Sequence, residues 1–516
     1  MEAVLWYHSA AEKDESGNIL SAAALQLGHC YLLGKGVPED VVQELYWFRQ
    51  AAKDGESDAQ YQLGFCYETG HGVVMDYTEA VYWYTQGATL DPDLPDDDMG
   101  DRNAQCALGR CYQLGRGVQQ DYEQAAIWYE RAADQGCSDA QYWLAELYYN
   151  GDGVPQKYDE AVRLFRQAAD QRDSHAQYRL GTCYSVGIGV FQNHVTAAHW
   201  YRLAVDQGNK SAQLQLGLCY RDGQGVQRDY KEAIRLFRLA ADQECVVAQF
   251  NLGLAFEEGQ GVEKDLPEAV RRYRVAADQG HADAKYCLGF CYKKGQGVLR
   301  SYTEAVCWFQ KAAEQGHVGA QFSLGWTYDW GFDEIVQDDT KAAHWYRLAA
   351  DQGHARAQFQ LAECYHWGEG AAQDFSQAVH WSRLAAVQGD IDALEKLGRY
   401  YDNGQGVDRD HAQALLYYAE AEKLQAAETA LSVQEHKTEL QRQRRSKESV
   451  EKRAAATKKN TDRRREQRHL KRSNSVATMP AMPATNTKIE PKLEFKAETA
   501  AEDEAAFSTY FNSLFS

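Results

Sequence analysis

The stretch Gly217–Gln243, GLCYRDGQGVQRDYKEAIRLFRLAADQ, reads as the end of one short helix, a turn bracketed by glycines and a second short helix. Similar stretches recur along the chain. The copies align on a common alanine, which stands at Ala23, Ala59, Ala104, Ala140, Ala176, Ala212, Ala248, Ala284, Ala320, Ala357 and Ala393. From Ala104 to Ala320 every step is 36 residues. A fixed period of this length indicates units stacked along one axis.

The first helix of each unit has an apolar face that carries one unusual residue. Ala212, Leu216 and Tyr220 recur at i, i+4 and i+8, which places them on one side of a helix. Gly217 lies inside this helix, although glycine costs about 1 kcal/mol there relative to alanine. Because nearly every unit repeats this glycine, we expect a neighbouring helix to press closely against it.

The turn and the second helix carry their own signals. Gly223 and Gly225 bracket the turn and predict left-handed backbone conformations. Ala233, Leu236, Phe237 and Ala240 then follow an i, i+3, i+4, i+7 pattern. The N-cap and N3 positions of a capping box are occupied by Asp229 and Glu232, Asp76 and Glu79, Asp265 and Glu268, and Ser301 and Glu304. Two short amphipathic helices cannot bury their apolar faces alone, so the units must stack.

The pattern A-x-x-x-L-G-x-x-Y-x-x-G-x-G-V-x-x-D-x-x-x-A-x-x-W-Y-x-x-A-A-x-x-G resembles the Sel1-like repeat, a relative of the tetratricopeptide repeat. The resemblance covers roughly four fifths of the chain. It implies an all-α protein, a right-handed α-solenoid with a concave groove. It also implies an adaptor or scaffold that recruits other proteins and has no chemistry of its own.

The repeat pattern divides the chain into four parts. Residues 1–22 are a partial first unit, and residues 23–424 form the solenoid of about eleven units. An acidic insertion at 90–102 is expected to be a solvated loop, with weak binding of a cation or a basic partner as the alternative. Residues 425–472 are expected to form a capping helix that continues into a basic arm, and 473–516 a disordered tail. The irregular turn GFDEIVQDD, which begins at Gly331, is one residue longer than the others and predicts a bend.

Composition and cysteine placement favour an intracellular protein. The start of the chain lacks a secretory signal pattern, and no apolar run reaches 18 residues, so neither secretion nor a membrane span is expected. Seven cysteines share one position of the repeat, where a thiol acts as a small apolar core side chain: Cys30, Cys66, Cys111, Cys183, Cys219, Cys291 and Cys364. This placement indicates a reducing compartment, cytoplasmic and/or nuclear.

The sequence offers little evidence of catalysis. The G-x-G turns never continue into a phosphate-binding motif, and no nucleophile motif is present. Cys287 and Cys291 are expected to be core residues rather than metal ligands. His199, His344 and His380 are expected on exposed helix faces. We therefore predict no enzyme activity, no cofactor and no metal.

A protein-binding groove is the main functional prediction. By analogy with tetratricopeptide units, residues three before, one after and five after the helix glycine should face the concave side. The series three before is Tyr61, Tyr142, Tyr178, Phe250, Tyr286, Phe322 and Phe359, for which packing between units is favoured. The partner-binding candidates are Phe65, Leu218, Leu254, Phe290 and Trp326 one after the glycine, and Trp330 and Trp367 five after it. Other units place His29, Arg110, Glu146, Thr182, Glu363 and Arg399 one after the glycine, so the fold does not require apolar residues there. Packing between units and binding of a peptide or helix remain alternatives for the candidates.

The basic arm suggests nuclear import. Residues 434–472 hold 15 Lys and Arg against 6 Asp and Glu, in a chain whose net charge is −20. The candidates for a bipartite import signal, which would bind an importin, are Lys452, Arg453, Lys458, Lys459, Arg463, Arg464 and Arg465. A site for nucleic acid or anionic lipid and a solvated helix are the alternatives. The arm has no interleaved aromatic residues, so base stacking is not indicated.

Two features follow the arm. Ser475 stands after Lys471 and Arg472 and fits a site for a basophilic kinase. The final segment, EDEAAFSTYFNSLFS, groups aromatic residues at near-helical spacing and could fold on a partner, or occupy the groove of its own array. Together these features predict a non-enzymatic adaptor that binds segments of partner proteins. The alternative is a nuclear regulatory factor whose arm contacts nucleic acid while the acidic solenoid recruits partners.

Overall fold

The fold was determined as a computed structural model, which describes residues 2–11, 20–89, 100–332, 334–427 and 429–430. In these residues the regular structure is helical apart from one isolated bridge. The helices are α1 (Glu2–Ala11), α2 (Ser21–Leu33), α3 (Val41–Lys53), α4 (Ser57–Thr69), α5 (Tyr77–Ala88), α6 (Arg102–Leu114), α7 (Tyr122–Asp134), α8 (Ser138–Asn150), α9 (Tyr158–Asp170), α10 (Ser174–Val186), α11 (His194–Asp206), α12 (Lys210–Asp222), α13 (Tyr230–Asp242), α14 (Val246–Glu258), α15 (Leu266–Asp278), α16 (Ala282–Lys294), α17 (Tyr302–Ala313), α18 (Val318–Trp330), α19 (Asp339–Asp351), α20 (Ala355–Trp367), α21 (Phe375–Val387) and α22 (Ile391–Asn403). Residues 411–427 form one more helix.

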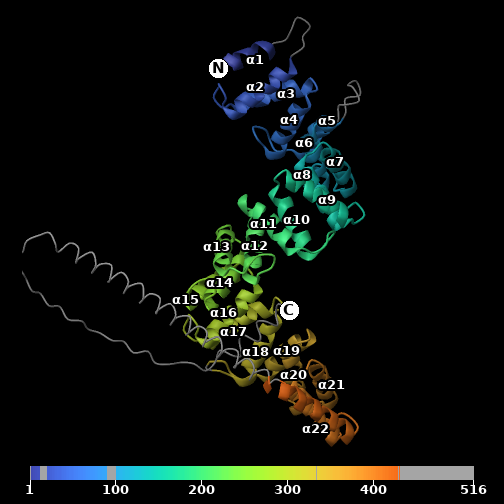
Figure 1. The fold of residues 1–516 in the computed structure, drawn as a ribbon, viewed down its shortest axis with the longest axis vertical. Helices are drawn as coiled ribbons and strands as arrows, with labels where there is room; N and C mark the ends of the chain where they lie inside the picture. The colour runs from blue at the N-terminus through green and yellow to red at the C-terminus, as the bar shows by residue number, and fades with distance from the viewer. Residues whose placement is uncertain (1, 12–19, 90–99, 333, 428, 431–516) are drawn as a thin grey trace, which may run out of the picture. The chain divides into compact units, whose positions relative to one another are not determined.

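The helices stack in chain order (Figure 1). Each even-numbered helix from α2 to α20 packs against the odd-numbered helix that follows it, and that helix packs against the next pair. Among the described helices, the substantial contacts beyond chain neighbours are those of α4 with α6. These pairs belong to the compact unit Met1–Glu422. The predicted all-α solenoid is confirmed.

The helix glycine lies against an aromatic ring of the second helix in the same unit. A Cβ atom on Gly217 would lie 2.6 Å from Cε1 of Phe237, which is closer than real Cβ contacts allow. The same contact recurs in other units, for example between Gly64 and the ring of Tyr84. The predicted close approach is confirmed, and the pressing group is a side-chain ring. Ala362 takes the glycine position above Ser382, where the aromatic ring is missing.

The turn glycines and the caps also follow the prediction. Gly223 and Gly225 have φ angles of 75° and 70°, in the left-handed region. A Cβ atom on Gly225 would lie 2.0 Å from the carbonyl oxygen of His194, the first residue of α11 in the preceding unit. The second glycine therefore permits close contact between units. The Asp229 carboxylate caps α13 by accepting hydrogen bonds from the amides of residues 231 and 232.

The cysteines have the core role that their position predicts. All twelve are free thiols. Of the seven at the shared position, Cys30 is half-buried and the others are buried. Burial raises the pKa of Cys219 to about 11 and that of Cys291 to about 12, so these thiols stay protonated at neutral pH. Cys287 and Cys291 pack in one core cluster with Tyr273.

A ladder of buried glutamines, which the sequence analysis did not predict, joins successive units. The Gln177 side chain is buried, and its Nε2 donates to the carbonyl oxygen of Ala169 at 3.1 Å. Its Oε1 accepts from Nε2 of Gln207 at 2.8 Å. One amide thus connects α10 to the helix before it and to the end of the helix after it. Because a buried amide is costly without partners, this ladder favours one spacing between units.

The irregular turn after α18 brings an aromatic ring back onto the helix. Phe332 and Ile335 form a short antiparallel bridge. The Phe332 ring stacks on Trp326, with 4.8 Å between ring centroids, and on Tyr302 at 4.6 Å. The irregular turn therefore covers part of the α18 surface with the Phe332 side chain.

Several predicted features lie outside the described residues: the acidic insertion apart from residues 100–102, the basic arm with its import-signal candidates, Ser475 and the C-terminal segment. None of the described helices has the length and apolar character needed to cross a lipid bilayer.

Candidate protein-binding face

The position one after the helix glycine is polar and paired in several units. Arg110 forms an ion pair with Glu68 at 2.8 Å, and Arg179 donates to Glu146 at 2.8 Å. Glu363 is bound by Lys396, also at 2.8 Å. The remaining polar members have weaker local contacts: the Thr182 hydroxyl donates to the Tyr178 carbonyl oxygen, His29 faces Asp58 at 3.7 Å, and Arg399 faces Glu395 at 3.7 Å. At this position a charge normally finds a partner, often in an adjacent unit.

In four consecutive units the same position is apolar. We call Leu218, Leu254, Phe290 and Trp326 the apolar strip; they lie on α12, α14, α16 and α18. All four are half-buried against neighbouring core clusters. Each therefore packs in the solenoid and keeps part of its surface exposed to solvent. Phe65, 43% exposed on α4, is separated from the strip by three polar units.

The aromatic series three before the glycine serves packing between units. The Phe250 ring lies 5.8 Å from the ring of Tyr273 in its own unit and stacks at 4.6 Å on His281 of the next unit. Tyr286 and Phe322 repeat this arrangement with His317 and His354. The structure supports the packing interpretation for these residues.

The three histidines also cap helices. Their Nδ1 atoms accept hydrogen bonds from the amides three residues later, at the start of α16, α18 and α20. Burial lowers the pKa of His281 and His354, which favours the neutral imidazole that can accept this bond. His199, His344 and His380 are exposed, as predicted.

The C-terminal end of the strip is an aromatic cluster around a lysine. Nζ of Lys293 lies 3.7 Å from the ring centroid of Trp326 and 5.7 Å from that of Phe290. Trp330 lies one helical turn beyond Trp326, 67% exposed, with 6.5 Å between the two ring centroids. These aromatic residues were predicted from the sequence as binding candidates, whereas Lys293 was not.

Trp367, in the following unit, has a different environment. It is 61% exposed, and its Nε1 donates to Oε2 of Glu363 at 3.1 Å. Lys396 binds the same carboxylate and lies 5.2 Å from the Trp367 ring centroid. Trp367 therefore adjoins a charged pair rather than the strip.

A hollow that the apolar strip does not line lies where one unit lacks a hydrogen bond that recurs in the repeat. In six units an arginine of the second helix donates to a tyrosine hydroxyl of the next unit, in the pairs Arg49–Tyr67, Arg166–Tyr184, Arg202–Tyr220, Arg274–Tyr292, Arg347–Tyr365 and Arg383–Tyr401. Between α13 and α14 the corresponding residues are Arg238 and Phe256, which has no hydroxyl.

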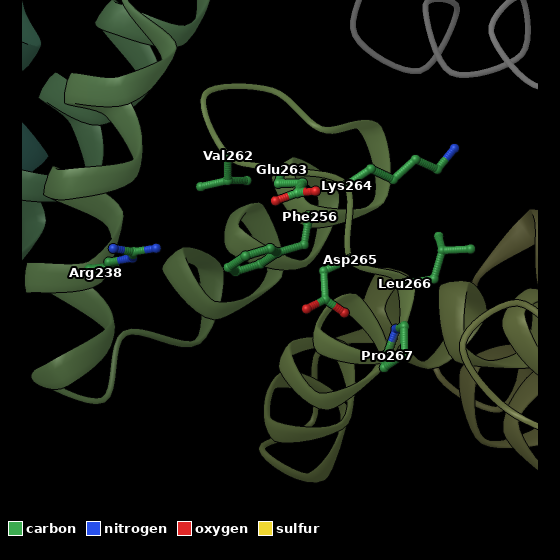
Figure 2. A pocket seen from close by; sticks show the side chains of 8 residues that line it. All are labelled: Arg238, Phe256, Val262, Glu263, Lys264, Asp265, Leu266 and Pro267. Carbon is green, nitrogen blue, oxygen red and sulfur yellow. The ribbon is translucent and has the colours of Figure 1, made fainter. Parts of the chain in front are cut away.

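Figure 2 shows this hollow, of about 800 Å³, with Arg238 on one side and the Phe256 ring facing it. The loop from Val262 to Asp265 and the first two residues of α15, Leu266 and Pro267, form the remaining wall. Arg238 has no hydrogen-bond or ion-pair partner among the residues that the structure describes. Across all the residues that the structure describes, no three His, Cys, Asp or Glu side chains are grouped to hold a metal ion.

Comparisons with known proteins identify the class. The Sel1 repeat family matches residues 1–15, 21–56, 57–92, 102–137, 138–173, 174–209, 210–245, 246–281, 282–317, 318–354, 355–390 and 391–425. The chain belongs to the Sel1 repeat family. No curated protein matches it.

The solved structures that are similar to the chain include two bacterial proteins with this repeat. One is c5321, a protective antigen of uropathogenic Escherichia coli strains with an SLR fold, 37% identical, with a TM-score of 0.68. The similarity covers 80% of this chain and 86% of that one. The other is a Sel1 repeat protein of Oxalobacter formigenes, 27% identical, with a TM-score of 0.48, covering 72% of this chain and 92% of that one. The chain thus has a Sel1 repeat solenoid, a fold that commonly serves as a scaffold for protein interactions.

Proposed function

We propose that this protein is a non-enzymatic adaptor whose apolar strip and neighbouring Trp330 bind an extended or helical segment of another protein. The observation that carries the proposal is the contrast at one position of the repeat. Four consecutive units place Leu218, Leu254, Phe290 and Trp326 where several other units place paired charges, such as Arg110 and Glu363. Apolar residues there are not required by the fold, so their concentration in consecutive units favours a binding role.

The energetics of the strip suit a partner segment. A tryptophan buries roughly 150–250 Å² on association, and apolar surface contributes about 25 cal/mol per Å² before the costs of binding are subtracted. Trp330 is largely exposed and rests beside the half-buried Trp326. Trp326 and Trp330 can bind an apolar side chain of the partner segment, while the rest of the strip contacts the residues on either side of that side chain in the segment.

The test is affinity capture with Trp326→Ala/Trp330→Ala against the wild type. Trp6→Ala is the matched control, because Trp6 on α1 is 69% exposed and Trp330 67%. We expect the double variant to lose partners that both the wild type and the control retain, with unchanged helical content by circular dichroism. Identical partner sets for all three proteins would reject the strip as the binding face.

We also propose that the basic arm, residues 434–472, directs nuclear import through an importin. The support is its excess of Lys and Arg in two clusters about ten residues apart. Deleting 434–472 from the tagged protein should abolish nuclear accumulation and leave partner capture intact. A deletion that leaves the distribution unchanged would contradict import. Salt-sensitive binding of nucleic acid by the full chain but not by the deletion variant would favour the nucleic-acid alternative.

A further inference from the structure

The ammonium group of Lys293 lies against the aromatic rings of Trp326 and Phe290. Its Nζ is close to the faces of Trp326 and Phe290, and among the described residues it has no carboxylate or hydrogen-bond acceptor as partner. Burial, with a smaller contribution from the neighbouring Lys294, lowers the pKa of Lys293 to about 8. The group is therefore partly desolvated, cationic at neutral pH and able to donate three hydrogen bonds.

Two other lysines in the solenoid show what is unusual about Lys293. Lys396 also lies near a tryptophan ring, that of Trp367, but it is paired with Glu363 at 2.8 Å. Lys311 lies 4.1 Å from the ring centroid of Trp308 on α17, and its side chain is exposed. Lys293, at the end of the apolar strip, combines partial burial and ring contacts with the lack of a carboxylate partner in the described part of the chain.

We propose that Lys293 binds an Asp or Glu side chain of the segment that occupies the apolar strip, next to an apolar residue of that segment that packs against Trp330. This inference rests on the proposed function and gives the chemistry of its ligand. A carboxylate at Lys293 supplies the missing counter-charge in a partly desolvated site, where a charge-assisted hydrogen bond is stronger than at an open surface.

The overall charge makes this preference distinctive. The chain carries a net charge of −20, so its long-range field disfavours acidic peptides. A preference for an acidic residue must then come from a local cation. Among the described residues, Lys293 is a cation that contacts the rings of Phe290 and Trp326. The other residues of the strip and its aromatic cluster are uncharged: Leu218, Leu254, Trp330 and Phe332.

The experiment uses a random library of 12-residue peptides displayed on phage and selected on the full chain. A selected peptide whose binding requires Trp326 and Trp330 is then synthesised in two forms, one with its acidic residue and one with Asn or Gln in its place. Affinities are measured for the wild type, for Lys293→Gln and for the control Lys311→Gln. Melting temperatures of the three proteins confirm that they are equally folded.

We expect the wild type and Lys311→Gln to bind the acidic peptide about tenfold more tightly than its amide form. Lys293→Gln should reduce that ratio to about twofold or less. If strip-dependent peptides show no acidic preference, or if the preference survives Lys293→Gln, the inference is overturned and the proposed function stands. If no selected peptide depends on Trp326 and Trp330, the proposed function fails and the inference fails with it.

Discussion

The units from α12 to α18 and the units that flank them share one backbone plan but differ at the residue after the helix glycine. Several units on either side place ion pairs there, such as Arg110 with Glu68 and Glu363 with Lys396, and the unit directly before α12 places Thr182 there. The central units place Leu218, Leu254, Phe290 and Trp326 there. Both solutions are compatible with the same stacking. Residues that build the solenoid recur in most units, whereas residues such as Leu218 and Trp326 give one stretch a surface of its own.

The largest expected effect comes from breaking the frame that both regions share. Gly217→Leu would force a side chain into the Phe237 ring, and we expect it to lower the free energy of unfolding by about 3 kcal/mol. Gly217→Ala should cost clearly less, because Ala145 occupies the same position above Phe165 in another unit. Chemical denaturation measures both variants. A melting temperature of Gly217→Leu within about a degree of the wild type would contradict the close-packing explanation.

The next prediction makes a flanking unit resemble the central ones. Lys396→Met should destabilise the protein by about 2 kcal/mol, because it leaves the partly buried Glu363 carboxylate without its cation. Glu363→Leu/Lys396→Met should recover most of that loss, since an apolar pair can replace an ion pair at little cost. A double-mutant cycle by urea denaturation tests this. If the two substitutions lower the free energy of unfolding additively, the interaction between Glu363 and Lys396 does not explain why charged residues occupy these positions.

The C-terminal units should also respond to acid in a way that the N-terminal ones do not. α16 and α20 are capped by His281 and His354, whose pKa values are lowered, whereas α6 and α10 are capped by aspartates. Below the unfolded histidine pKa of about 6.5 the folded state binds fewer protons than the unfolded chain. The free energy of unfolding should therefore fall as pH drops below that value.

The control for the acid effect is His281→Asn/His354→Asn, since Asn209 caps α12 in the same way. This variant should lose less stability between pH 7 and pH 5.5 than the wild type in thermal melts. Over the same pH range, the hydrogen-exchange protection factors of the wild type, which correct for the slower intrinsic exchange in acid, should fall more at α16 and α20 than at α6 and α10. Equal acid sensitivity of the variant and the wild type would exclude the histidine caps as its source.

The smallest effect concerns the hollow between α13 and α14. Phe256→Tyr restores the hydroxyl that six other units provide, and Arg238 can donate to it. We expect a gain of about 0.5–1 kcal/mol in the free energy of unfolding. Tyr220→Phe, which removes the acceptor of Arg202, should cause a loss of similar size. If both changes are neutral, the bond between units contributes nothing measurable.

The recurrent features were predictable from the sequence because each is local. Gly217, Gly223, Gly225 and Asp229 act on their own helix ends or on one neighbour at fixed spacing, so the repeat itself reveals their roles. The buried glutamine ladder was not predictable. A glutamine such as Gln177 is usually a surface residue, and only the packed structure shows that it bonds to the helices before and after its own.

The proposed binding face was predictable only in part. The strip residues could be named from their position relative to the glycine. The proposed role of Lys293 could not, because it depends on contact with Trp326 of the next unit and on the lack of a carboxylate partner among the described residues. The sequence of the irregular turn indicated a departure from the repeat, but it did not predict that Phe332 stacks on Trp326. These contacts join residues from different units and require the packed structure.

The proposed function requires that partners bind the face of the central units rather than the solenoid at large. The most direct measurement is photo-cross-linking in the presence of a captured partner, with benzoylphenylalanine introduced at position 330 or, as the matched exposed site, at position 6. We predict cross-links to one defined partner segment from position 330 and none to that segment from position 6. Equal cross-linking from both positions, or cross-linking from position 6 alone, would contradict the account.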